Sequence, residues 1–214
     1  MRDSPHQGWQ AYRNAFRRDA HQLLAWGYAA ARKLISSDSE ETEVTGFIAE
    51  AIEKLLDGTE IDSRFEHYEV AEDNPIPGES RTGKRRRRAD LRIKSRVLKP
   101  RPRYIFEAKR LRSTSHGTRG YLGAEGLLRF LGSTSYAEEA FEAAMVGYIQ
   151  TETPAIWAQK LQSVFVTDSA GELRVVRSLE PVTDATCFDN CLISSHTKTD
   201  GETIELYHIL LDCT

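Results

Sequence analysis

The chain has 214 residues, enough to bury a hydrophobic core, and its composition does not divide it into regions of different character. Its formal net charge of -3 argues against a protein that coats nucleic acid nonspecifically, because such binding depends on neutralising phosphate charge. Three cysteines do not form a disulfide framework, and no apolar run approaches the roughly 20 residues of a membrane helix. With a polar N-terminus as well, we expect an unexported cytoplasmic protein with no membrane span.

Two helices are predicted at the start of the chain. Apolar residues at near-helical spacing, without proline, predict a long helix or two abutting helices over residues 9–35. Residues 37–39 offer N-caps for a second helix, whose apolar stripe ends at Leu56, just before Gly58. We expect residues 1–36 to form an N-terminal helical extension and residues 37–214 to form one domain.

The remaining chain alternates short extended segments with helices. Strands are predicted where β-branched or alternating residues lie between proline and glycine, at residues 65–70, 89–97, 103–109, 145–150, 163–167, 173–177 and 204–211. Helix is predicted over residues 123–130 and 136–144, with a break near Gly132, and around Trp157 and Leu161. This order of elements predicts an α/β fold with a central mixed β-sheet flanked by helices.

Two of the predicted strands carry a candidate metal site. Alternation along residues 89–97 places Asp90 on the face opposite its apolar neighbours, and Glu107 and Lys109 share one side of the next strand. Adjacent strands would therefore bring two carboxylates and one ammonium together. Carboxylate oxygens suit Mg2+, with Mn2+ as a substitute, and a nearby amine can orient water and offset charge developing on a phosphate. The alternative is a solvated strand face with ordinary ion pairs.

The acidic helix, the strand Asp90 and the apolar-apolar-Glu-x-Lys run at residues 105–109 resemble the PD-(D/E)XK, or restriction-endonuclease-like, nuclease superfamily. The resemblance implies a restriction-endonuclease-like core and metal-dependent hydrolysis of phosphodiester bonds, mostly in DNA. It assigns Asp90, Glu107 and Lys109 to the three motif positions, with Asp90 and Glu107 as metal ligands. The proline that names the motif is absent before Asp90.

The resemblance also implies a glutamate on the preceding helix that contacts the metal directly or through water. Glu43 is the best match and Glu50 is the alternative, although acidic residues at a helix N-terminus also complement its dipole. We expect guanidinium groups to contact the nucleic-acid backbone just before Asp90 and, after the Glu-x-Lys strand, near the scissile phosphate; the candidates are Arg85, Arg86, Arg87, Arg88 and Arg129.

By analogy, a small nuclease of this kind fits the effector of a restriction or anti-phage defence system that works with a partner subunit or as a homo-oligomer. The alternative is a catalytically inactive nuclease-like subunit that binds nucleic acid or a partner protein, against which the intact Asp90, Glu107 and Lys109 argue. A zinc site is not expected, because the cysteine and histidine spacing near the C-terminus fits no usual pattern. His196 and His208 flank a predicted turn and are expected in a hairpin.

Overall fold

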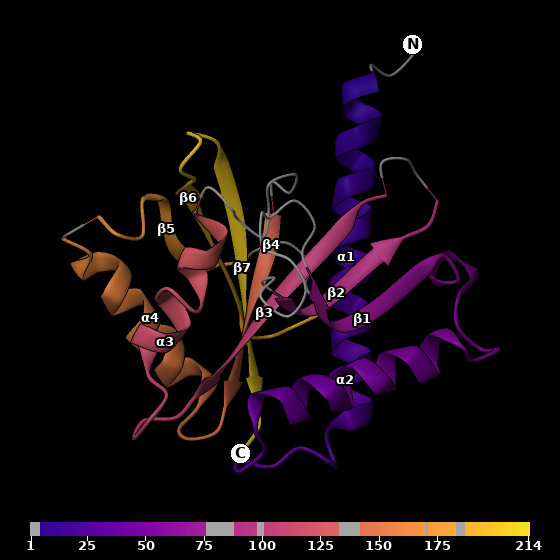
Figure 1. The fold of residues 1–214 in the computed structure, drawn as a ribbon, viewed down its shortest axis with the longest axis horizontal. Coiled ribbons are helices and arrows are strands. Elements are labelled where there is room, and N and C mark those ends of the chain that lie inside the picture. The colour runs from indigo at the N-terminus through magenta and orange to yellow at the C-terminus, as the bar shows by residue number, and fades with distance from the viewer. Residues whose placement is uncertain (1–4, 76–87, 98–100, 133–141, 170, 183–186) are drawn as a thin grey trace.

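A mixed β-sheet of seven strands organises the described part of the chain, with helices on both faces (Figure 1). The computed structural model describes residues 5–75, 88–97, 101–132, 142–169, 171–182 and 187–214. The strands are Tyr68–Pro75 (β1), Arg88–Ser95 (β2), Arg103–Leu111 (β3), Glu142–Ile149 (β4), Val175–Pro181 (β5), Cys191–Thr197 (β6) and Thr203–Asp212 (β7). They lie in the order β1-β2-β3-β4-β7-β6-β5. The predicted α/β class, with a central mixed sheet flanked by helices, is confirmed.

Strand direction changes across the sheet. β1, β2 and β3 are antiparallel neighbours, β3, β4 and β7 are parallel, and β7, β6 and β5 are antiparallel again. Parallel neighbours need a crossover connection. Between β3 and β4 the chain contains the short helix α3 (Thr118–Leu122) and the 3-10 turn η3 (Leu127–Phe130), and α4 (Pro154–Thr167) follows β4. β3 therefore has an antiparallel neighbour on one side and a parallel one on the other.

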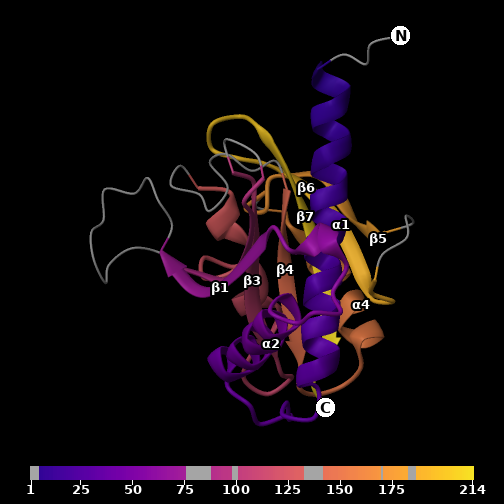
Figure 2. The same ribbon diagram turned by 90° about the vertical axis from the view of Figure 1, so that its right-hand side faces the viewer.

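The helices α1 (Pro5–Ala31) and α2 (Glu41–Leu56) pack on one face of the sheet. Leu23 of α1 and Ile48 of α2 are fully buried in the same cluster as Phe106 of β3. The two helices approach closely at Gly27, where a Cβ would lie 2.5 Å from Cγ1 of Ile52. α1 thus shares the core of the residues that follow it, while its N-terminal end projects beyond the sheet (Figure 2).

The opposite face of the sheet is covered by α3, η3 and α4. Tyr121 of α3, Phe130 of η3 and Trp157 of α4 are buried there against strand residues such as Leu206. No helix of the described segments has both the length and the apolarity needed to cross a bilayer. The sheet therefore has an apolar layer on each face, and the polar residues of β2 and β3 are described separately below.

The strand predicted at residues 163–167 is wrong, because these residues form the last turns of α4. The β-branched Val164, Val166 and Thr167 favour a strand, but the buried apolar residues of this segment recur every four residues, as in a helix. Trp157, Leu161 and Phe165 form one buried stripe of the helix. Thr153 caps the helix by accepting a hydrogen bond from the Ile156 amide at 3.4 Å.

The helix predicted over residues 123–130 is also wrong: α3 ends at Leu122, and only η3 follows it. Gly126 explains the break, since a Cβ there would lie 2.0 Å from the Tyr121 carbonyl oxygen and the chain has to turn back. In the predicted helix 136–144, the residues from Glu142 onward belong to β4 and the earlier ones lie outside the described residues.

Several strand positions also differ from the prediction. Phe65 ends a 3-10 turn, η1 (Ser63–Phe65), so that β1 starts only at Tyr68. β5 lies two residues later than predicted at its start. β6 was given no predicted range, although the hairpin expected at His196 and His208 implies a strand there. The alternation that marks a half-buried strand is missing in β6, because most of its residues are buried.

His196 and His208 lie on neighbouring strands of the β6–β7 hairpin, as predicted. Ser194 Oγ bridges them, at 2.7 Å from His196 Nε2 and 2.8 Å from His208 Nε2. His196 Nδ1 donates to the Leu173 carbonyl oxygen. The Tyr121 hydroxyl, which donates to the Met145 carbonyl oxygen, also lies 3.2 Å from His208 Nδ1. Burial lowers the pKa of both histidines and so favours their neutral form.

Replacing His208 by glutamine should flatten the acid dependence of stability. Burial, with a smaller contribution from the His196 charge, lowers the pKa of His208 to about 3. The unfolded histidine binds a proton near pH 6.5, so the contribution of the neutral native form is present above that pH and is lost as pH falls toward 3. Urea unfolding between pH 4 and 7 should show a wild-type slope steeper by up to about 1.4 kcal/mol per pH unit than that of His208→Gln. Parallel curves would contradict this.

Candidate active site

β2 and β3 separate after the Leu91–Phe106 pair, and two carboxylates satisfy the backbone beyond it. The Ala108 amide donates to Asp90 Oδ2 at 2.7 Å, and the Arg110 amide donates to Glu41 Oε2 at 3.1 Å. Such amides need an acceptor once they are buried, and β2 no longer supplies one. Asp90 from β2 and Glu41 from the first turn of α2 are therefore held against β3.

Lys109 lies at the centre of the carboxylates. Its Nζ is 2.9 Å from Glu107 Oε1, 3.0 Å from Glu41 Oε1 and 3.6 Å from Asp90 Oδ2. The same ammonium donates to the Ala108 carbonyl oxygen at 2.5 Å. The structure thus brings together the three residues that the motif singled out, and it adds Glu41 to them.

Glu107 is the most buried member of the group, with no exposed side-chain surface. Its Oε1 accepts from Lys109 and from Arg129 Nη1, the latter at 2.7 Å. Its Oε2 is buried and has no hydrogen-bond partner among the described residues. A buried carboxylate oxygen without a partner is costly. Glu107 therefore carries an acceptor that the protein itself leaves unsatisfied.

Burial sets the ionisation of this cluster. Burial, reinforced by the charge of Asp90, raises the pKa of Glu107 to about 7, and burial likewise raises the pKa of Asp90. Burial alone would lower the pKa of Lys109, but the carboxylates of Glu107, Asp90 and Glu41 outweigh it and raise that pKa. At neutral pH Lys109 is consequently protonated, whereas Glu107 is divided between its protonated and ionised forms.

The predicted arginines are only partly brought to the site. Arg129 of η3 reaches Glu107 and also contacts the Glu125 carboxylate. Arg88 is the first residue of β2, and its Nε donates to Asp73 Oδ1 at 2.5 Å. The other members of the basic run, Arg85, Arg86 and Arg87, lie outside the described residues.

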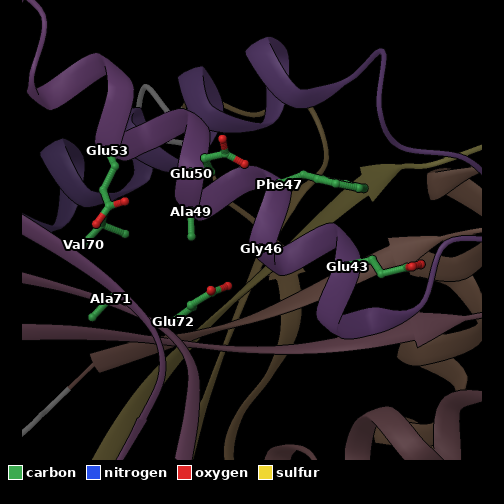
Figure 3. A pocket seen from close by; sticks show the side chains of 9 residues that line it. All are labelled: Glu43, Gly46, Phe47, Ala49, Glu50, Glu53, Val70, Ala71 and Glu72. Atoms are coloured by element: carbon green, nitrogen blue, oxygen red, sulfur yellow. The ribbon is translucent and has the colours of Figure 1, made fainter.

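The helix glutamate that the structure brings to Lys109 is Glu41, and not the predicted Glu43 or its alternative Glu50. Glu43 accepts a hydrogen bond from the Glu40 amide at 2.8 Å in a capping box, and Glu50 pairs with Lys54. Figure 3 shows both glutamates in an open cleft between α2 and β1, lined also by Glu72. Neither contacts Lys109 in the described structure. Glutamate is not a usual N-cap residue, so the capping box of Glu40 and Glu43 has no clear sequence signal that would separate Glu41 from Glu43.

The chemistry of the donors fits a divalent metal ion such as Mg2+. Asp90, Glu107 and Glu41 offer hard oxygen ligands, and the unsatisfied Oε2 of Glu107 is one of them. No group of three or more aspartate, glutamate, histidine or cysteine side chains in the described segments is already arranged around a common point for a metal ion. The carboxylates converge instead on Lys109 Nζ, which supplies the counter-charge.

Comparison of the chain with protein-family models, with curated proteins and with solved structures gave no match. The chemistry of the cluster therefore rests on its own geometry.

Replacing Lys109 by methionine should destabilise the fold in EDTA at pH 8 by about 3 kcal/mol, because it removes the cation from a largely buried carboxylate group. The double variant Glu107→Gln/Lys109→Met should recover part of that loss, since the buried carboxylate is then gone. Chemical unfolding of the wild type, the two single variants Glu107→Gln and Lys109→Met, and the double variant measures both effects. A Lys109→Met protein as stable as the wild type would show that the ammonium does not balance the cluster.

Proposed function

We propose that this protein is a Mg2+-dependent nuclease that hydrolyses phosphodiester bonds, most readily in DNA. The observation that carries the proposal is the group of three carboxylates around one partly buried ammonium, with an unsatisfied Glu107 oxygen. Two carboxylates and a lysine on adjacent strands, with a helix carboxylate beside them, also agree with the resemblance to the PD-(D/E)XK superfamily. A restriction-endonuclease-like core is part of the same proposal.

Asp90, Glu107 and Glu41 would hold the metal ion, which when bound supplies Lewis-acid polarisation of a phosphate oxygen and a more acidic water. Asp90 and Glu41 are positioned by the amides of Ala108 and Arg110, so their carboxylates need no reorganisation to remain at the site. Preorganised charge of this kind lowers the cost of stabilising a transition state.

Lys109 and Arg129 would act on the phosphate. Because the surrounding carboxylates raise the pKa of Lys109 against the effect of burial, its ammonium donates a hydrogen bond and does not accept a proton. It can thus offset negative charge that develops on the phosphate oxygens. Arg129, held beside Glu107 at 2.7 Å, adds a second cation on the η3 side.

The biological setting follows by analogy. A compact nuclease of this kind suits the effector of a restriction or anti-phage defence system, acting with a partner subunit or as a homo-oligomer. The second candidate function is a nuclease-like subunit that binds nucleic acid or a partner protein without turnover. Cleavage assays separate the two.

The test incubates purified protein with plasmid, linear duplex, single-stranded DNA and RNA in Mg2+, Mn2+ or EDTA. We expect cleavage that requires the divalent ion. Asp90→Asn and Glu41→Gln should each lower the rate roughly hundredfold or more, because each removes a preorganised charge at the reacting centre. No cleavage of any of these substrates by the folded wild-type protein would contradict the proposal.

Glu43→Gln is the matched control, since it removes a carboxylate two residues away in the same helix turn. Because glutamine can also accept the capping-box hydrogen bond from the Glu40 amide, its expected cost is only the charge–dipole contribution, about 0.5 kcal/mol, with cleavage retained. Loss of cleavage in Glu43→Gln but not in Glu41→Gln would restore the helix assignment made from the sequence.

A further inference from the structure

Two arginines on the strands of the candidate site have no partner for their side chains. Arg92 on β2 and Arg103 on β3 make no ion pair and no side-chain hydrogen bond, within the described structure. Nε of Arg92 is buried yet unsatisfied. Arg103 is exposed, whereas a guanidinium nitrogen that is withdrawn from water, as Nε of Arg92 is, usually has a carboxylate or another acceptor.

Other cations near Arg92 and Arg103 do have a carboxylate partner. Glu69 takes up two other cations nearby, with its Oε2 3.7 Å from Lys94 Nζ and its Oε1 in contact with Arg96 Nε. For Arg92, burial and then the Arg103 charge lower the pKa, whereas the Glu69 charge raises it. Because Glu69 already pairs with Lys94 and Arg96, it offsets the repulsion between the two arginines only in part, and a further anion would stabilise them.

The position of the pair links it to the carboxylate cluster. In the β2–β3 ladder Arg92 lies opposite Ile105 and Lys94 lies opposite Arg103, and directly opposed residues share a face of the sheet. Alternation puts Asp90 and Glu107 on that face as well. Arg92 is two residues from Asp90, about 7 Å along the strand, and Arg103 is four residues from Glu107, about 14 Å.

We propose that Arg92 and Arg103 form a phosphate-binding subsite that holds the nucleic-acid backbone beside the cleaved bond, so that the substrate runs along β2 and β3 away from Lys109. The inference rests on the proposed nuclease function for its choice of ligand. It is nevertheless a statement about binding, and it does not require turnover. It gives the substrate a path on the sheet itself, on the other side of Asp90 from Arg88.

Binding is tested by fluorescence anisotropy in EDTA, where no cleavage occurs, with a labelled 20-nucleotide single strand, a 20-base-pair duplex and polyglutamate over a NaCl titration. The double variant Arg92→Gln/Arg103→Gln should bind both nucleic acids roughly ten- to hundredfold more weakly, because two charge-assisted contacts are lost. The slope of log K against log salt should fall by about 1.4 for the single strand and 1.8 for the duplex.

Lys33→Gln/Lys54→Gln removes the same charge from α2 and from the turn after α1. It should bind within about twofold of the wild type, since neither lysine lies on the proposed path of the nucleic acid. Arg92→Lys/Arg103→Lys should retain most of the binding and salt slope, and unchanged circular dichroism melting will show that the glutamine variant is folded. The subsite would be overturned if Arg92→Gln/Arg103→Gln bound nucleic acid like the wild type, or if it lost polyglutamate binding by the same factor as nucleic-acid binding. Cleavage without Arg92 dependence would refute the subsite alone, whereas Arg92-dependent binding without cleavage would refute only the nuclease.

Discussion

The separation of β2 from β3 after Leu91 and Phe106 is the constraint on which the site depends. A regular ladder would pair the β3 amides with β2 carbonyls and leave no place for side chains between the strands. Because the strands part, the amides of Ala108 and Arg110 take Asp90 and Glu41 as acceptors. The same two hydrogen bonds that satisfy the backbone also join the start of α2 to the sheet and place two carboxylates next to Lys109.

Charge balance explains why such a cluster persists in the fold. Three carboxylates face Lys109 and Arg129, so the cluster carries an excess of negative charge when every group is ionised. Burial of Glu107 makes this arrangement costly and leaves one of its oxygens without a partner. Local arrangements that oppose stability are typical of functional sites. A divalent cation would balance the excess negative charge and give the unsatisfied oxygen a partner. A purely structural ion pair requires neither an excess of charge nor an unsatisfied oxygen.

The sequence predicted the parts of this site that depend on strand alternation. Asp90, Glu107 and Lys109 could be placed on one side of two neighbouring strands because a period of two decides the face. Glu41 could not be distinguished from Glu43 in this way, because both are in the first turn of α2 and only the capping box and the docking of that turn on β3 separate them. The β-branched residues at the end of α4 predicted a strand there, although its buried residues recur every four positions, as in a helix. The unpaired state of Arg92 and Arg103 is a property of tertiary contacts and has no signal in the sequence.

The most direct test of the central claim is a crystal structure of the protein grown with Mn2+, examined by anomalous scattering. Our account predicts a manganese ion about 2.1 Å from carboxylate oxygens of Asp90 and Glu107, with Glu41 bound directly or through water. Lys109 Nζ should then lie outside the carboxylate group, since two cations cannot share its centre. A well-ordered structure with no anomalous peak there, and with Lys109 still between the three carboxylates at saturating Mn2+, would show that the cluster is a structural ion-pair network.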